Sequence, residues 1–167
     1  LPAKICYNNY RECRGTEVSA IKKRKLFCEL SPACYHISLK KEYLLRDIHD
    51  RFSGEIFART RNTVPFSAVV KSHSSNALRR LEGVDMELQR NKLVNLRLAS
   101  AQINGLVVQP GETFSFWKLV GEPSAKRGYL DGLVISAGKL GRGVGGGLCQ
   151  LANLIHWLVL NSPLTVT

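Results

Sequence analysis

Negative charge is scarce in this chain of 167 residues, and no side chain after Asp131 carries it. The 13 Asp and Glu residues face 24 Lys and Arg residues, so the formal net charge at pH 7 is +11. The basic excess lies early in the chain and includes an unbroken run at residues 22–25. We therefore predict a basic N-terminal arm over residues 1–25, which could bind an anionic polymer. Because interleaved aromatic side chains and nucleic-acid motifs are missing, the sequence argues against nucleic acid as the partner.

Long hydrophobic runs are also missing. The most apolar stretch, residues 151–160, is interrupted by Asn153 and His156 and is much shorter than the roughly 20 residues that a membrane-spanning helix needs. The N-terminus has neither an apolar run nor a small-residue cleavage site, so we expect no signal peptide, no membrane span and a cytoplasmic location. With 44% hydrophobic and 22% charged residues, the composition is that of a globular domain that buries a core.

The number of cysteines is odd, which excludes complete disulfide pairing within one chain. The five are Cys6, Cys13, Cys28, Cys34 and Cys149. The two closely spaced pairs in the first 34 residues could form disulfides in an oxidising compartment, and free thiols are the alternative in a reducing one. Cys28, Cys34 and His36 lack the C-x(2–4)-C spacing of structural zinc sites, so we predict no metal site.

Hydrophobic periodicity and turn residues predict helices and strands in an order without regular alternation. The predicted helices cover residues 37–52, 88–104 and 151–160, and the predicted strands cover 64–70, 113–116, 129–136 and 164–167. The expected buried stripe of the second helix is Leu93, Leu96, Ser100 and Ile103. Pro110 and Gly111 predict a type II turn. This order favours an α+β fold in which helices pack on a small, mostly antiparallel sheet.

The segment 141–150 contains five glycines in seven residues, followed by Leu148, Cys149 and Gln150. Glycines at this density allow a sharp turn with positive φ. The segment lacks the Gly-Lys-Ser/Thr ending of a phosphate-binding loop, and no acidic residue follows it as the dinucleotide fingerprint requires. Both nucleotide interpretations therefore fail, and no cofactor is predicted. Because a helix is predicted directly afterwards, Cys149 falls in its first turn, at the positive end of the helix dipole.

One interpretation makes Cys149 a catalytic nucleophile, with Gln150 and the amides of the glycine segment stabilising an oxyanion. A base within hydrogen-bond reach is then needed. His156 shares a helix face with Cys149 but lies seven residues further on, about 10 Å along the axis, which is too far. His73, in the Ser-rich loop 71–76, is the remaining candidate base.

Two other interpretations need no chemistry at Cys149. In the first, a binding groove is lined by Gly145, Gly146, Gly147, Trp117 and Asn153. In the second, the glycines let the turn pass close to the following helix, and Cys149 is a small packed residue. The sequence leaves all three interpretations open, and so it leaves open whether the protein is an enzyme.

Several motifs within residues 84–167 resemble the VanW-like family. They are Pro-Gly-Glu-Thr-Phe-Ser-Phe at 110–116, Gly-Gly-Gly-Leu-Cys-Gln at 145–150 and Ser-Pro-Leu-Thr-Val-Thr at 162–167. Residues 26–32 and 72–76 are similar to the N-terminal part of family members that stand alone. Since members usually continue past the position of Thr167 into a Glu-x-x-His or Glu-x-His-x-His stretch, the resemblance implies that the domain at 84–167 is incomplete at its C-terminal end. A helix-and-strand segment at 26–83 precedes this domain.

The resemblance implies a role in glycopeptide (vancomycin) resistance and in the cell-wall metabolism of Gram-positive bacteria, without fixing a reaction. One possibility is a Cys-dependent acyl transferase or hydrolase that acts on peptidoglycan peptides. The other is a non-catalytic accessory module that binds a cell-wall peptide or sugar, while the basic arm holds anionic polymer. In both cases the expected partner is a cell-wall precursor or a peptidoglycan fragment.

Overall fold

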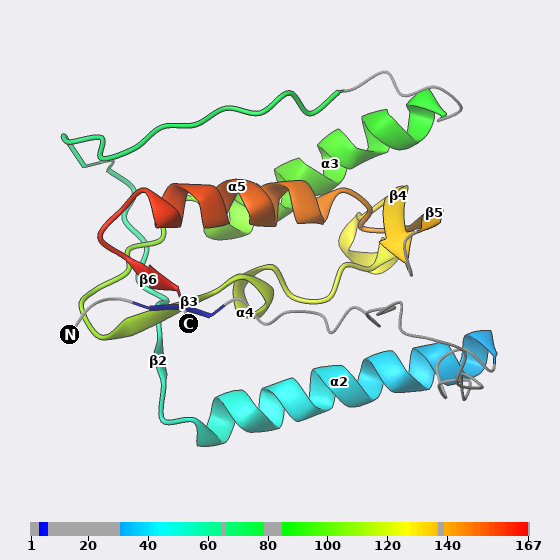
Figure 1. The fold of residues 1–167 in the computed structure, drawn as a ribbon, viewed down its shortest axis with the longest axis horizontal. Helices are drawn as coiled ribbons and strands as arrows, with labels where there is room; N and C mark the ends of the chain where they lie inside the picture. Colours follow the sequence, from blue (N-terminus) through cyan, green and yellow to red (C-terminus); the bar gives the residue numbers. More distant parts are fainter. Residues whose placement is uncertain (1–3, 7–30, 65, 79–84, 137–138, 167) are drawn as a thin grey trace, which may run out of the picture. The chain divides into compact units, whose positions relative to one another are not determined.

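The computed structural model describes residues 4–6, 31–64, 66–78, 85–136 and 139–166 (Figure 1). The chain divides into two compact units, one formed by Leu1–Arg14 together with Phe57–Thr167 and the other by Gly15–Ile56. Most of the expected basic arm, including its charged run at 22–25, lies outside the described residues, and so do Cys13 and Cys28.

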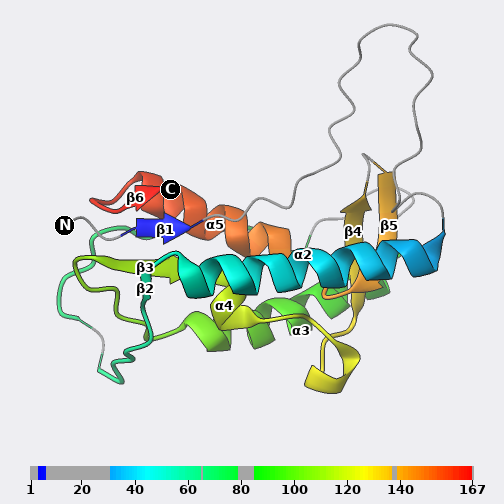
Figure 2. The same cartoon turned by 90° about the horizontal axis from the view of Figure 1, so that it is seen from below.

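A four-stranded sheet and a separate hairpin contain the strands. The order in the sheet is β2 (Ile56–Phe57), β3 (Glu112–Ser115), β1 (Lys4–Cys6) and β6 (Thr165–Val166), as Figure 2 shows. The hairpin pairs β4 (Asp131–Ser136) with β5 (Lys139–Val144) in the expected antiparallel direction. In contrast, β1 is parallel to both β3 and β6. Because no short turn joins β1 to either neighbour, nothing imposes the antiparallel direction of a hairpin on it.

The described helices are α2 (Pro32–Phe52), α3 (Met86–Ile103), α4 (Phe116–Val120), the short 3-10 helix η1 (Ala125–Arg127) and α5 (Leu148–Leu160). Side-chain caps set where two of them begin. Ser31 accepts a hydrogen bond from the Cys34 N–H at 3.2 Å, and Asp85 accepts one from the Glu87 N–H at 2.8 Å. The α+β class is therefore confirmed. None of the helices in the described ranges combines the length and the apolar character needed to cross a membrane.

Three of the four predicted strands are confirmed, and the one at 64–70 is wrong. At its start the Asn62 side chain accepts the Val64 N–H at 3.1 Å, and the apolar side chains beyond stay in solvent, with Val69 80% and Val70 74% exposed. Branched apolar side chains favour a strand only where one face of it is buried. Here neither face is covered, so the sequence preference produces an extended segment without strand pairing.

The buried face of α3 differs from the predicted stripe. Leu93 is 37% exposed and Ser100 is also exposed. The buried residues of this helix are instead Gln89, Lys92, Asn95 and Ala99. The face is mostly polar because it binds backbone groups of the hairpin and of the turn before α5. The apolar core lies beside it and consists of Ala99, Phe114, Phe116, Val120, Tyr129, Leu148 and Val159.

Asn95 is 0% exposed and joins three segments that are far apart in the sequence. Its amide nitrogen donates to Leu130 O at 2.9 Å and to Gly146 O at 3.0 Å, and its Oδ1 accepts the Leu130 N–H at 2.8 Å. The carboxamide therefore uses both of its donor hydrogens and its acceptor oxygen. One turn earlier, Asn91 donates to Asp131 O at 3.0 Å. Through these bonds α3 anchors the start of β4 and the turn that precedes α5.

Gly132 and Gly146 place two backbone segments in direct contact. A Cβ atom on Gly146 would clash with the Gly132 backbone, and one on Gly132 would lie 2.8 Å from Gly146 O. At Gly141, by comparison, the nearest atom to an added Cβ would be Val134 Cγ2 at 3.6 Å, an ordinary contact. The need for glycine is therefore strict in the turn after β5 and weak at Gly141 within β5.

Replacing Asn95 by Ala should lower the free energy of unfolding by about 3 kcal/mol, because it leaves the Leu130 N–H and Gly146 O without their partner and removes one of the two hydrogen bonds to Leu130 O. The Asn91→Ala control removes one half-buried hydrogen bond and should cost about 1 kcal/mol. Urea denaturation followed by circular dichroism measures both. Equal losses in the two variants would show that Asn95 is not the principal anchor.

Replacing Gly146 by Ala should destabilise the protein by about 3 kcal/mol, because the added methyl group forces the Gly132 backbone away. The matched Gly141→Ala change should alter stability by less than about 1 kcal/mol. Thermal unfolding of the two variants in parallel tests this difference. A Gly146→Ala protein as stable as the Gly141→Ala protein would contradict the described contact.

Candidate functional site

Cys149 lies at the second position of α5, and it is exposed. The expected glycine loop is shorter than the sequence indicates, because Gly141 and Gly143 belong to β5. The sharp turn consists of residues 145–147, in which Gly145 has φ of 79° and Gly147, the N-cap of the helix, has φ of 95°. The turn therefore ends where α5 begins and fixes the position of the thiol in its first turn.

The three glycines of this turn are buried, and each is packed closely against another part of the fold. A Cβ on Gly145 would lie 2.5 Å from Pro123 Cβ, and one on Gly147 would clash with the aliphatic chain of Lys92. Two of the turn's amides are also engaged, since the Gly145 N–H donates to Leu130 O at 3.0 Å and the Gly146 N–H to Gly143 O at 3.2 Å. These packing and hydrogen-bonding constraints account for glycine at all three positions.

Gln150 contacts the predicted Ser-rich loop. Its amide nitrogen donates to Ser75 Oγ at 2.9 Å and to Asn76 O at 3.1 Å. In Figure 1 the chain around these residues runs beside α5. We call residues 71–76 the strap. The structure therefore brings the strap, which also carries His73, to the helix that carries Cys149.

His73 contacts the opposite part of α5. Its ring stacks on Trp157, with the ring centroids 4.2 Å apart, and Lys71 Nζ lies 5.2 Å from the centroid of the same indole. Trp157 follows Cys149 by eight residues, which is about 12 Å along a helix axis. In this arrangement His73 is therefore held about two turns from the thiol, while Ser75 and Asn76 lie near the start of the helix.

The other residues singled out from the sequence lie in different surroundings. Trp117 belongs to α4, is half-buried and packs edge-on against Phe116 with ring centroids 5.1 Å apart. Asn153 is exposed one turn after Cys149. His156 is half-buried, with its Nδ1 atom enclosed. Within the described parts of the chain, no group of three or more His, Cys, Asp or Glu side chains is placed to hold a metal ion.

Sequence reasoning missed Asn95 and Lys92, two residues of α3 whose side chains contact the turn at 145–147. Lys92 is 9% exposed and its aliphatic chain packs on Gly147, while Asn95 binds Gly146 O. A signal for them exists: Gln89, Lys92 and Asn95 recur every three residues on one face of α3. The apolar residues on the neighbouring face gave a stronger periodic pattern, which directed the prediction to a stripe of which Leu96 and Ile103 are only half-buried.

Comparison with known proteins gives a family for the region that contains the turn. Residues 91–167 match the family model described as VanW like protein. The chain is 41% identical over 123 residues to vancomycin B-type resistance protein VanW of Enterococcus faecalis, a match that covers 70% of this chain and 42% of that protein. It is 41% identical over 61 residues to the uncharacterized protein YoaR of Bacillus subtilis, covering 36% of this chain and 20% of YoaR. No solved structure matches the chain.

The matches to the two relatives cover less than half the length of either protein. The residues matched by the family model include the turn and the first turn of α5. The family model and the identity to VanW agree with the motifs that the sequence shows at 110–116 and 145–150. Residues 91–167 of this chain therefore match the VanW-like family.

Proposed function

We propose that this protein takes part in resistance to vancomycin-type glycopeptides and that it acts on cell-wall peptides at Cys149. The first part is supported by the relationship to VanW, whose name states vancomycin B-type resistance. The second part is carried by one observation, the exposed thiol of Cys149 at the second position of α5. The first turn of a helix attracts negative charge and leaves backbone amides without acceptors inside the helix.

In this proposal the Cys149 sulfur attacks the carbonyl carbon of a peptide amide. The carbon–nitrogen bond then breaks, the amine leaves with a proton, and the resulting thioester is cleaved by water or by an acceptor amine. The oxyanion is stabilised by amides at the start of α5, since those of Gly145 and Gly146 already donate to Leu130 O and Gly143 O. Gln150 uses its amide group to hold the strap beside the thiol. For His73 to act as the base, it would have to leave Trp157.

A non-catalytic role is the second candidate, and the strap is the observation that favours it. At one end of the strap the His73 ring stacks on Trp157, and near the other end the Ser75 hydroxyl accepts a hydrogen bond from Gln150. Both residues proposed to assist the thiol, His73 and Gln150, are therefore already in contact with other groups. The glycines are explained by packing alone. In this alternative the protein binds a cell-wall peptide or sugar without forming a covalent bond, and Cys149 is dispensable.

A Cys149→Ser change should abolish any increase in vancomycin resistance that the protein gives to a bacterial host, because serine in this position lacks the nucleophilicity of a thiol. The matched control is Cys34→Ser, which removes the half-buried free thiol on α2 and should leave resistance unchanged. The measurement is the vancomycin concentration that inhibits growth, with the amount of each protein checked by immunoblotting.

Three results would separate the alternatives. If both serine variants protect as well as the parent protein, thiol chemistry is excluded and the binding role takes its place. If Cys149→Ala still binds soluble peptidoglycan fragments saturably while resistance is lost, the thiol acts after binding. If the parent protein gives no protection, the proposed link to glycopeptide resistance is wrong for this chain.

A further inference from the structure

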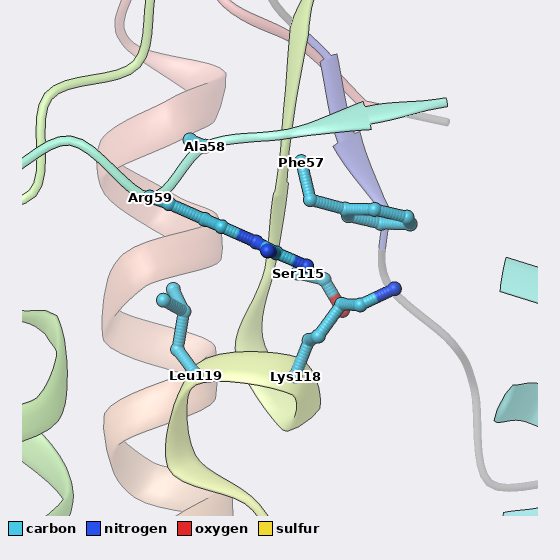
Figure 3. A pocket seen from close by; sticks show the side chains of 6 residues that line it. All are labelled: Phe57, Ala58, Arg59, Ser115, Lys118 and Leu119. Atoms are coloured by element: carbon cyan, nitrogen blue, oxygen red, sulfur yellow. The ribbon is translucent and has the colours of Figure 1, made fainter. Parts of the chain in front are cut away.

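A cleft lies beside β2, β3 and α4, on other elements than Cys149. It encloses about 210 Å³ and is lined by Phe57, Ala58, Arg59, Ser115, Lys118 and Leu119 (Figure 3). Two of these side chains carry positive charge and none carries negative charge. The volume is below the roughly 300–1,000 Å³ of sites for drug-sized ligands. The cleft therefore suits a small ligand or the end of a larger one.

The segment that carries Arg59 is held in place on both sides. The Ala58 N–H donates to Thr113 O at 3.0 Å, and Thr60 O accepts the Val107 N–H at 2.9 Å. Figure 3 shows the Arg59 side chain extending from this segment toward Ser115. Among the residues that the structure describes, the guanidinium of Arg59 has no hydrogen-bond or ion-pair partner. A guanidinium presents parallel N–H donors, which match the two oxygens of an oxyanion.

Ser115 supplies a buried polar group on the same cleft. The residue is 7% exposed, and although it is the N-cap of α4, its side chain makes no capping hydrogen bond. Its hydroxyl has no hydrogen-bond partner within the described ranges. Because Ser115 Oγ is not among the fully enclosed, unpartnered side-chain atoms of the described residues, it is open to the cleft and can donate its hydrogen to an oxyanion there.

Lys118 adds positive charge at the edge of the cleft. Its Nζ lies 3.6 Å from the centroid of the Phe57 ring, a cation–π contact that restrains the ammonium group. Phe57, Ala58 and Leu119 form the apolar part of the lining. The cleft thus combines a restrained cation, an arginine fork and a small apolar surface.

We propose that this cleft binds the oxyanion end of a small ligand, with the terminal carboxylate of a short peptide as its source. Arg59 donates two parallel hydrogen bonds to the carboxylate, Ser115 donates one, and Lys118 contributes attraction. Ala58 and Leu119 contact a small side chain next to the carboxylate. Inorganic phosphate offers the same chemistry and is the other source to test. Nothing in this binding depends on the thiol of Cys149.

The test is isothermal titration of the whole chain with N-acetyl-alanyl-alanine, with its C-terminal amide and with inorganic phosphate. The free acid should bind and the amide should not, because the amide lacks the charge that Arg59 recognises. Arg59→Gln should weaken binding of the free acid about tenfold or more, and Ser115→Ala should weaken it less. The control is Arg97→Gln, which removes the same charge from an exposed position on α3 and should bind like the parent protein.

An Arg59→Lys variant keeps the charge and loses the fork, so its affinity should fall between those of the parent protein and Arg59→Gln. A different result would be that phosphate binds, that Arg59→Gln abolishes this binding, and that the free acid does not bind. The cleft would then be an oxyanion site, and its assignment to a peptide carboxylate would be overturned. The site itself is wrong if neither anion binds at about 10 mM, or if Arg59→Gln and Arg97→Gln bind equally. Circular dichroism of each variant shows that the fold is intact. A Cys149→Ala protein should bind the acid normally, which separates this site from the proposed thiol chemistry.

Discussion

The fully buried carboxamide of Asn95 is the interaction on which the candidate site depends. It holds Leu130 before β4 and Gly146 before α5, so one side chain of α3 fixes two backbone segments relative to each other. In that arrangement Gly132 and Gly146 are in close contact, and both must be glycine because no Cβ fits between the two segments. The exposure of Cys149 in the first turn of α5 follows from this anchoring, since the helix begins where the turn ends.

Two separate surfaces result from the same framework. Along α5, the strap is tied to Gln150 at one end and to Trp157 at the other. Beside β3, the residues that end the strand and begin α4 line a cleft with two cations. The segment 105–116 connects them physically, because its backbone holds residues 58–62 through Thr113, Val107 and Gly105, and its Phe114 side chain enters the core.

Much of this fold could be predicted from local signals in the sequence. The Asp85 cap, the Pro110–Gly111 turn with φ of 85° at Gly111, and the hairpin strands all depend on residues close together in the chain. The errors concern contacts between distant residues. The three-residue spacing of polar side chains around Asn95 does not by itself indicate that they are buried, and nothing near Val69 shows that no partner covers it. Likewise, His73 could be named as a base from its chemistry, but its stacking on Trp157 depends on the path of the whole strap.

The position of β1 within the sheet affects how the protein folds. This strand of three residues lies between β3 and β6 and pairs with Thr113 on one side and Thr165 on the other. The centre of the sheet therefore joins residues from opposite ends of the sequence, and such contacts close large loops and form slowly. On a ribosome β1 must wait for residue 165 to emerge before its second edge is paired. Until then the backbone donors and acceptors of that edge stay open to other chains, which favours aggregation of the newly made protein at this strand.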